Sequence, residues 1–148
     1  MTEAQRITED LRRAWDGNPW HGSSVSAILA GVTAAGAAAR PIPSAHTIWE
    51  LTLHMAAWAG EATRRLGGAE AAEPADGDWP AMPPDPTDAA WTDAKLRLAE
   101  AHAELTGTVA ARAELSDLEA YTVNGLLQHH AYHAGQVALL RKLVQGGN

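Results

Sequence analysis

Three histidines occur within five positions, at His129, His130 and His133, in the segment "LLQHHAYHAGQ" (126–136). On a helix, His129 and His133 lie one turn apart and project about 40° apart, so both rings can point at one place. Imidazole nitrogens bind divalent metals at about 2.0–2.1 Å, which suits this spacing. His130 projects to the same side of the helix, so geometry also allows His130 and His133 as the pair. Histidine pairs with this spacing also arise by chance, so the pair alone does not indicate a metal site. A third ligand from another helix is needed.

His54 is the candidate for this third ligand. It lies beside Met55 and one turn from Leu51 and Trp58, on the flank of an apolar stripe within residues 44–66. A residue on that flank is expected to point toward the core of a helical protein. The alternative is a core histidine that is hydrogen bonded to a backbone or hydroxyl group, which is the more common fate of a single buried histidine.

Other polar residues near these histidines are candidates for assisting a metal. Glu50 lies one turn before His54, where its carboxylate can orient the His54 ring or act as a general base. A solvated glutamate on a helix is an equal alternative for Glu50. Tyr132 and Gln136 flank His133 and can line a pocket, although Tyr132 also suits packing between helices. His46 lies one turn before Glu50 near the helix start, so a structural or exposed role is expected for it, and His21 and His102 belong to no such cluster.

The spacing of apolar residues predicts four long helices, and no segment alternates with the period of two that is typical of strands. The expected helices span residues 2–15, 44–66, 87–112 and 122–145. Ser44 is expected to cap the second of them, after a boundary at Pro41 and Pro43. A shorter helical piece is expected within "SSVSAILAGV" (23–32). The histidine pair then lies on the last long helix, and its proposed third partner lies on the second.

A long connection with five prolines separates the second and third expected helices, at residues 67–86. Such a length is uncommon in a compact domain, but about 20 extended residues can return along a whole helix. We therefore predict a crossover that packs onto the body of the protein through Trp79. Four long helices and one crossover predict a single all-α domain over residues 1–148, a four-helix bundle. All six tryptophans are expected in the core: Trp15, Trp20, Trp49, Trp58, Trp79 and Trp91.

The composition excludes several kinds of site and partner. The chain has no cysteine, which excludes disulfides and thiolate ligands and fits a reducing compartment, so we expect a cytoplasmic protein. A net charge of −7 lacks the basic footprint that binding to duplex DNA requires, so no nucleic-acid partner is expected. No run of 18 apolar residues predicts a membrane span, and the charged N-terminus lacks the apolar core of a signal peptide.

The chain contains the segments "IPSAHTIWELTLHMAAWAGEATRRL" (42–66) and "LLQHHAYHAGQVALLRKL" (126–143), the second with an H-x-x-Y-H-x-G-Q motif. These two segments resemble the DinB/YfiT superfamily of metal-dependent enzymes. The stretches "NPWHG", "RPIP" and "GDWP" also look like one branch of that superfamily. The resemblance covers nearly the whole chain. It implies a four-helix bundle with a crossover between the second and third helices.

The resemblance also implies a ligand set for a divalent metal, zinc or nickel. Carried over residue by residue, the metal histidines of the superfamily fall on His54, His129 and His133. The resemblance thereby selects His129 over His130. In relatives, position 130 is commonly acidic or variable, so a histidine there departs from the usual pattern and leaves a supporting role open.

Finally, the resemblance implies a class of activity. Three imidazoles on one metal leave positions for a substrate, whereas structural zinc sites are usually closed by four protein ligands. The resemblance implies an enzyme that acts on a small molecule, as a thiol-dependent S-transferase or a hydrolase. The low-molecular-weight thiol would be external, because the chain has no cysteine. The alternative is a non-catalytic metal-binding module of a stress response, and either form could be a homodimer.

Overall fold

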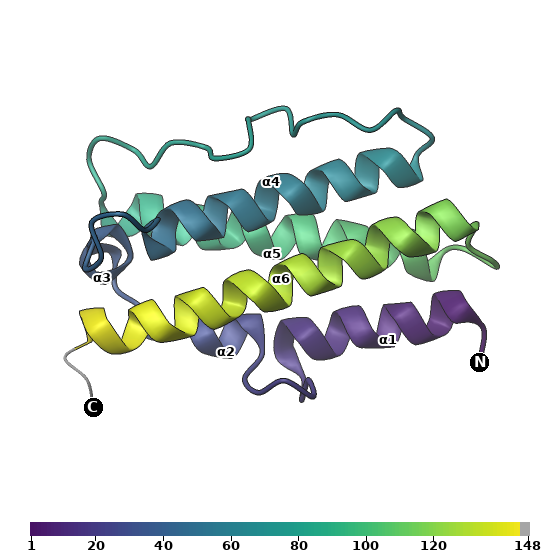
Figure 1. Cartoon of the computed structure of the whole chain (residues 1–148), viewed down its shortest axis with the longest axis horizontal. Helices are drawn as coiled ribbons and strands as arrows, with labels where there is room; N and C mark the ends of the chain where they lie inside the picture. Colours follow the sequence, from purple (N-terminus) through teal and green to yellow (C-terminus); the bar gives the residue numbers. More distant parts are fainter. Residues whose placement is uncertain (146–148) are drawn as a thin grey trace.

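The computed structural model of the chain describes residues 1–145, and every regular element in this range is a helix. The helices are α1 (Glu3–Asp16), α2 (Val25–Leu29), α3 (Ala34–Ala38), α4 (Ile48–Leu66), α5 (Asp88–Ala110) and α6 (Asp117–Val144) (Figure 1). The prediction of an all-α protein is therefore confirmed. Within the described residues, no helix combines the length and the apolar character that crossing a membrane requires.

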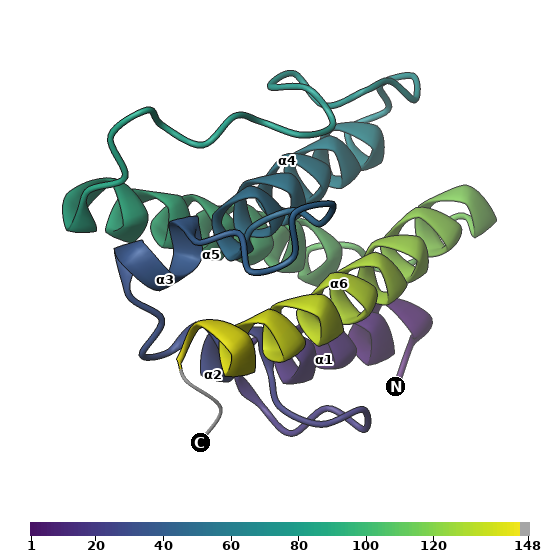
Figure 2. The same cartoon turned by 60° about the vertical axis from the view of Figure 1, so that its left-hand side comes forward.

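The four long helices pack side by side along most of their lengths. Helix α4 contacts α5 and α6, and α1 contacts the same two helices from the other side (Figures 1 and 2). Helices α4 and α5 run in the same direction, so the chain between them must return along the molecule. Figure 1 shows this connection, residues 67–87, running back beside α4. The connection therefore lies close to the residues at the middle of α4.

Histidines separate two apolar clusters of the core. On α4, one cluster ends at Met55 and the other begins at Ala59. On α6, the corresponding interval lies between Leu126 and Ala134. All three histidines of α6 fall in this interval, and on α5 the buried His102 lies at the same level. The middle of the core is thus polar, and its ring nitrogens need partners because unpaired buried polar groups are costly.

Two helix starts differ from the predicted ones because capping boxes determine them. Thr47, not Ser44, caps α4: its hydroxyl accepts the Glu50 N–H at 3.1 Å, and the Glu50 carboxylate accepts the Thr47 N–H at 2.8 Å. The same reciprocal pair, made by Ser116 and Glu119, starts α6 before the expected Thr122. Each box satisfies two backbone donors that the first helical turn leaves without partners.

Two of the six tryptophans are exposed, so the prediction that all lie in the core is wrong for them. Trp20 is 104% exposed, because it lies in the turn that joins α1 to α2. Trp79 is 37% exposed, yet one face of its ring packs on His54. The prediction that Trp79 packs onto the body of the protein is confirmed.

Candidate metal centre

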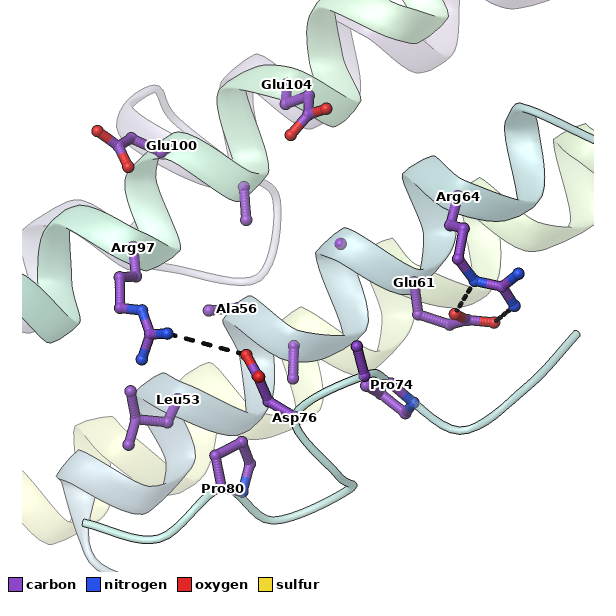
Figure 3. A pocket seen from close by; sticks show the side chains of 14 residues that line it. Leu53, Ala56, Glu61, Arg64, Pro74, Asp76, Pro80, Arg97, Glu100 and Glu104 are labelled. Carbon is purple, nitrogen blue, oxygen red and sulfur yellow. Dashed lines mark hydrogen bonds and ion pairs between the residues drawn. The ribbon is translucent and has the colours of Figure 1, made fainter. Parts of the chain in front are cut away.

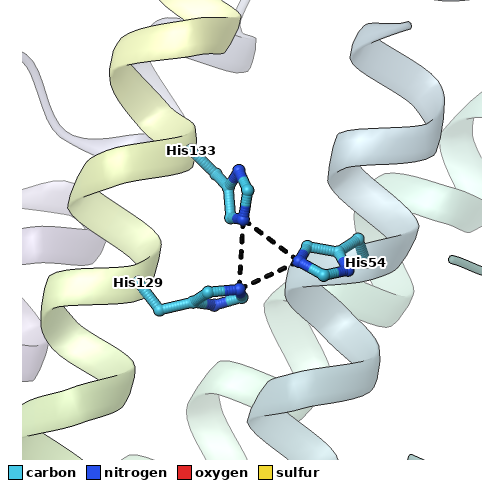
Figure 4. A group of neighbouring side chains, drawn as sticks. All are labelled: His54, His129 and His133. Carbon is cyan, nitrogen blue, oxygen red and sulfur yellow. Dashed lines mark hydrogen bonds between the residues drawn. The ribbon is translucent and has the colours of Figure 1, made fainter. Parts of the chain in front are cut away.

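Three imidazole nitrogens converge between α4 and α6 (Figure 4). Helix α4 supplies His54, and consecutive turns of α6 supply His129 and His133. The Nε2 atom of His54 lies 2.9 Å from that of His129 and 3.0 Å from that of His133, and the last two are 3.1 Å apart. The three predicted ligands are therefore brought together, and they can hold a metal ion.

Two of these rings are oriented by acceptors on their far side. The Nδ1–H of His54 donates to the backbone oxygen of Asp78 at 2.5 Å, and the Nδ1–H of His133 donates to Oε1 of Gln136 at 2.6 Å. A neutral imidazole protonated on Nδ1 has a lone pair on Nε2. The lone pairs of His54 and His133 thus face each other, and no hydrogen bond can join them. A cation at the point of convergence would remove this repulsion, so the donor set fits a metal.

The environment keeps the His54 and His129 rings uncharged. Burial, together with the neighbouring His133 and His54, lowers the pKa of His129 to about 4. Burial also lowers the pKa of His54, although its hydrogen bond to Asp78 acts in the opposite direction. Both rings are therefore neutral at neutral pH. Neutral imidazole is the form that binds a metal, so neither ring has to be deprotonated from the imidazolium form first.

The spacing of the nitrogens suits three ligands of one ion. The Nε2 atoms of His54, His129 and His133 lie 2.9–3.1 Å apart and would hold one ion together. An ion with three protein ligands would keep a position for water or a substrate. A cavity of about 310 Å³ reaches His54 and His129 from the surface between α4 and α6. Small molecules therefore have a route to the site.

The connection between α4 and α5 supplies the groups around His54. The Oδ1 atom of Asp78 accepts the Trp58 Nε1–H at 2.8 Å and lies 3.4 Å from Nδ1 of His54. The Trp79 ring stacks between His54 and His46, with centroid distances of 3.8 and 3.5 Å. Neither Asp78 nor a stacking role for Trp79 was predicted from the sequence. Their only signal was "GDWP" at 77–80, which the resemblance had singled out without giving it a role.

Glu50 does not orient His54, so that prediction is corrected. One of its carboxylate oxygens accepts from Arg40 Nη2 at 2.7 Å, and the other accepts the Thr47 N–H at 2.8 Å. Burial alone would raise the pKa of Glu50, but the hydrogen bonds from Arg40 and Thr47 outweigh it and lower the pKa. Asp78 takes the orienting role. A role for Glu50 as general base stays a prediction, and the lowered pKa makes this carboxylate a weaker base.

His130 belongs to the core, outside the convergent triad. Its side chain is fully buried, and its Nε2–H donates to the backbone oxygen of Met55 at 3.1 Å. It stacks on His102 with a centroid distance of 5.9 Å, and the Nε2–H of His102 donates to the Leu11 oxygen at 2.9 Å. Sequence reasoning placed His102 in no cluster, because its partners come from other helices. Burial lowers the pKa of His130 to about 3, so this ring is also neutral.

The residues near His133 differ in whether they contact its ring or pack against another helix. Gln136 is the acceptor for His133, as described above. Tyr132 is 67% exposed, so it does not pack between the helices. A Cβ atom added to Gly135 would meet nothing within 4 Å, so Gly135 does not serve a close approach of helices within the described chain.

Comparisons with known proteins give no match, whether with family models, with curated proteins or with solved structures. The resemblance to the DinB/YfiT superfamily therefore rests on the motifs quoted above. The chemistry of the site has to be argued from its own geometry.

Proposed function

We propose that this protein is a metal-dependent enzyme of the DinB/YfiT type that acts on a small molecule, as a thiol-dependent S-transferase or as a hydrolase. One observation carries the proposal: the Nε2 atoms of His54, His129 and His133 converge within 2.9–3.1 Å of one another. The packing of the four long helices, with residues 67–87 returning beside α4, supports a four-helix bundle with a crossover.

The proposed ion is zinc or nickel, since imidazole ligands suit both. Such an ion supplies Lewis acidity to an oxygen or sulfur ligand in its remaining positions. The chain itself holds the ligand rings: Asp78 and Gln136 fix the orientations of His54 and His133 through their far nitrogens. Partners of this kind keep the lone pairs aimed at the ion and raise the basicity of the rings.

Asp78 is also the candidate base for the proposed reaction. Its carboxylate lines the cavity beside His54 and is 48% exposed, so it can reach a molecule that enters. The hydrogen bond from Trp58 to Oδ1 holds it there. A carboxylate in this position can accept the proton of a thiol or a water molecule. The thiol has to be external, because the chain has no cysteine.

The open side of the triad favours an enzyme over a non-catalytic module. Structural zinc sites are usually closed by a fourth protein ligand, whereas the group of possible ligands among the described residues contains three histidines. The site also faces a cavity that can take a small molecule. The net charge of −7 supports the proposal that nucleic acid is not the partner, and a cytoplasmic location is proposed from the absence of cysteine.

The test is cobalt substitution of protein purified without a histidine tag. The proposal expects one cobalt ion per chain, and it expects the cobalt spectrum to change when a small thiol is added. His133→Ala should show neither effect. A cobalt spectrum that indicates a fourth protein ligand and stays unchanged with thiols, together with no hydrolysis of model esters and amides, would favour the non-catalytic module.

A further inference from the structure

The cavity beside the triad has a second polar end. It begins at His54 and His129 and extends between α4 and α6 to Arg65. The wall between the two ends is mainly apolar and includes Trp58 and Leu126. A cavity of about 310 Å³ is large enough for a small organic molecule. Its two ends therefore can bind two different groups of one ligand.

Arg65 has donors to spare for a ligand. Its Nε donates to Glu61 at 2.8 Å, and its Nη2 donates to the backbone oxygen of Ala72 at 3.1 Å. Its Nη1 makes no hydrogen bond within the described residues. The guanidinium carbon lies 5.7 Å from the centroid of the Trp58 ring, which keeps the group beside the cavity. Two N–H groups of Nη1 are thus available to an acceptor.

Arg65 shares its carboxylate partner with a second guanidinium. The buried Glu61 carboxylate accepts from both Arg64 and Arg65, so two guanidiniums share one carboxylate. Arg64 lies at a different cavity of about 450 Å³, between α4, α5 and the crossover, where Figure 3 shows its pairing with Glu61. That second cavity is lined by further carboxylates, including Glu100. Carboxylates outnumber guanidiniums in the lining of both cavities, so binding of an anion in the first cavity depends on the uncommitted Nη1 of Arg65 beside the Trp58 ring.

We infer that the cavity beside the triad binds small monocarboxylates, with the carboxylate on Arg65 and a short hydrocarbon or aromatic body against Trp58. Trp58 lies between the two ends, because its centroid is 6.1 Å from that of His129 and 5.7 Å from the Arg65 guanidinium carbon. A single uncommitted nitrogen, with the carboxylates of Glu61 and Asp78 on the same cavity, favours a singly charged anion over a phosphate. Under the proposed function, on which this part rests, the far end of the ligand carries the thiol or other group that meets the triad.

The first experiment uses metal-free protein and therefore does not depend on the proposed function. Calorimetric titration compares 4-phenylbutyrate with its uncharged amide, 4-phenylbutyramide. We expect the carboxylate to bind about tenfold more tightly, as for a hydrogen bond to a charged group. Arg65→Gln should abolish this preference, and Arg65→Lys should keep part of it. The matched control is Arg97→Gln in the second cavity, which should bind like the wild type. Equal binding of acid and amide by the wild type, or an undiminished preference in Arg65→Gln, would overturn the inference.

The second experiment addresses the group at the triad end. Cobalt-loaded protein is titrated with 6-mercaptohexanoate and with 6-mercaptohexanol, and the sulfur-to-cobalt absorption is followed. The acid should saturate at about tenfold lower concentration in the wild type, whereas both thiols should behave alike in Arg65→Gln. If both thiols saturate the cobalt absorption at the same concentration in the wild type, the inference about Arg65 fails, whereas the assignment of the metal site is unaffected. If no cobalt is taken up, the proposed function fails, and the metal-free titration still decides the role of Arg65.

Discussion

The Nε2 atoms of His54 and His133 lie 3.0 Å apart although each ring donates its proton from the opposite nitrogen. Two lone pairs at this distance repel each other, and they come from helices that are far apart in the sequence. A cation at this point, which the Nε2 atom of His129 also faces, would remove the repulsion. This relationship underlies the first of the predictions below.

Metal binding should stabilise the folded protein and should depend on all three histidines. Because the ion binds the folded state only, zinc or nickel at about 100 times the dissociation constant should add about 2.7 kcal/mol to the free energy of unfolding. His54→Ala, His129→Ala and His133→Ala should each lose both the bound metal and this stabilisation. Elemental analysis and thermal unfolding measure the two effects, with the exposed His21→Ala as the control. Stoichiometric metal in His54→Ala or His133→Ala would contradict the assignment.

His130→Ala should keep its metal but lose stability. The substitution leaves a cavity in the core and removes the partner of the Met55 carbonyl. We expect a loss of roughly 2–4 kcal/mol in the free energy of unfolding, measured with urea. Metal content per folded chain should equal that of the wild type. The opposite pattern, in which His130→Ala loses metal while His129→Ala keeps it, would make His130 and His133 the ligand pair.

Gln136→Leu should weaken metal binding about 10–100-fold without removing a ligand, because His133 loses the acceptor that orients it. Gln136→Glu should restore most of the affinity, since a carboxylate oxygen can accept the same proton. Competition with a chromophoric chelator measures the affinity. Gln128→Leu makes the same change at an exposed position of α6 and should have no effect. Equal affinities of Gln136→Leu and Gln128→Leu would show that the hydrogen bond has no orienting role.

Glu61→Gln should destabilise the protein at neutral pH and much less in acid. Hydrogen bonds from Arg64 and Arg65 lower the pKa of the buried Glu61 from 4.5 to about 2. The stabilisation from this carboxylate is present above the unfolded-state pKa and is lost as the pH falls toward the folded-state value. The difference in unfolding free energy should be roughly 3 kcal/mol at pH 7 and should shrink between pH 4.5 and 2. Urea unfolding of the wild type and Glu61→Gln over this pH range measures the difference. A difference that does not change with pH would contradict the lowered pKa of Glu61.

Glu50→Ala should lower stability by roughly 1 kcal/mol while leaving metal affinity unchanged, because Glu50 completes the capping box of α4. Glu104→Ala, at an exposed position of α5, is the control for the loss of one carboxylate. Thermal unfolding and a chelator competition are measured on both. If Glu50→Ala weakens metal binding tenfold or more, the original prediction that Glu50 supports His54 has to be restored.

Local patterns in the sequence account for the helical class of the fold. The apolar stripes that predicted four long helices reflect side-chain periodicity, which depends on neighbours within a few turns. The errors at the starts of α4 and α6 were also local: Thr47 with Glu50 and Ser116 with Glu119 have the spacing of a capping box. These two starts could have been predicted from the sequence. The exposure of Trp20 could not, because the composition of a turn does not tell which way a side chain leaves it.

The sequence by itself determined that His129 and His133 share one face of a helix, because residues four apart on a helix always lie one turn apart. Adjacent residues on α6 both project toward the core, so helix geometry left His129 and His130 as equal alternatives, and only the resemblance chose between them. The tertiary structure distinguishes the two residues: His130 donates a hydrogen bond to the Met55 carbonyl on α4, whereas His129 faces His54. The tertiary structure alone also brought Asp78 to His54, since that contact depends on the path of a long connection across α4. Neighbouring residues in the sequence do not encode such a path.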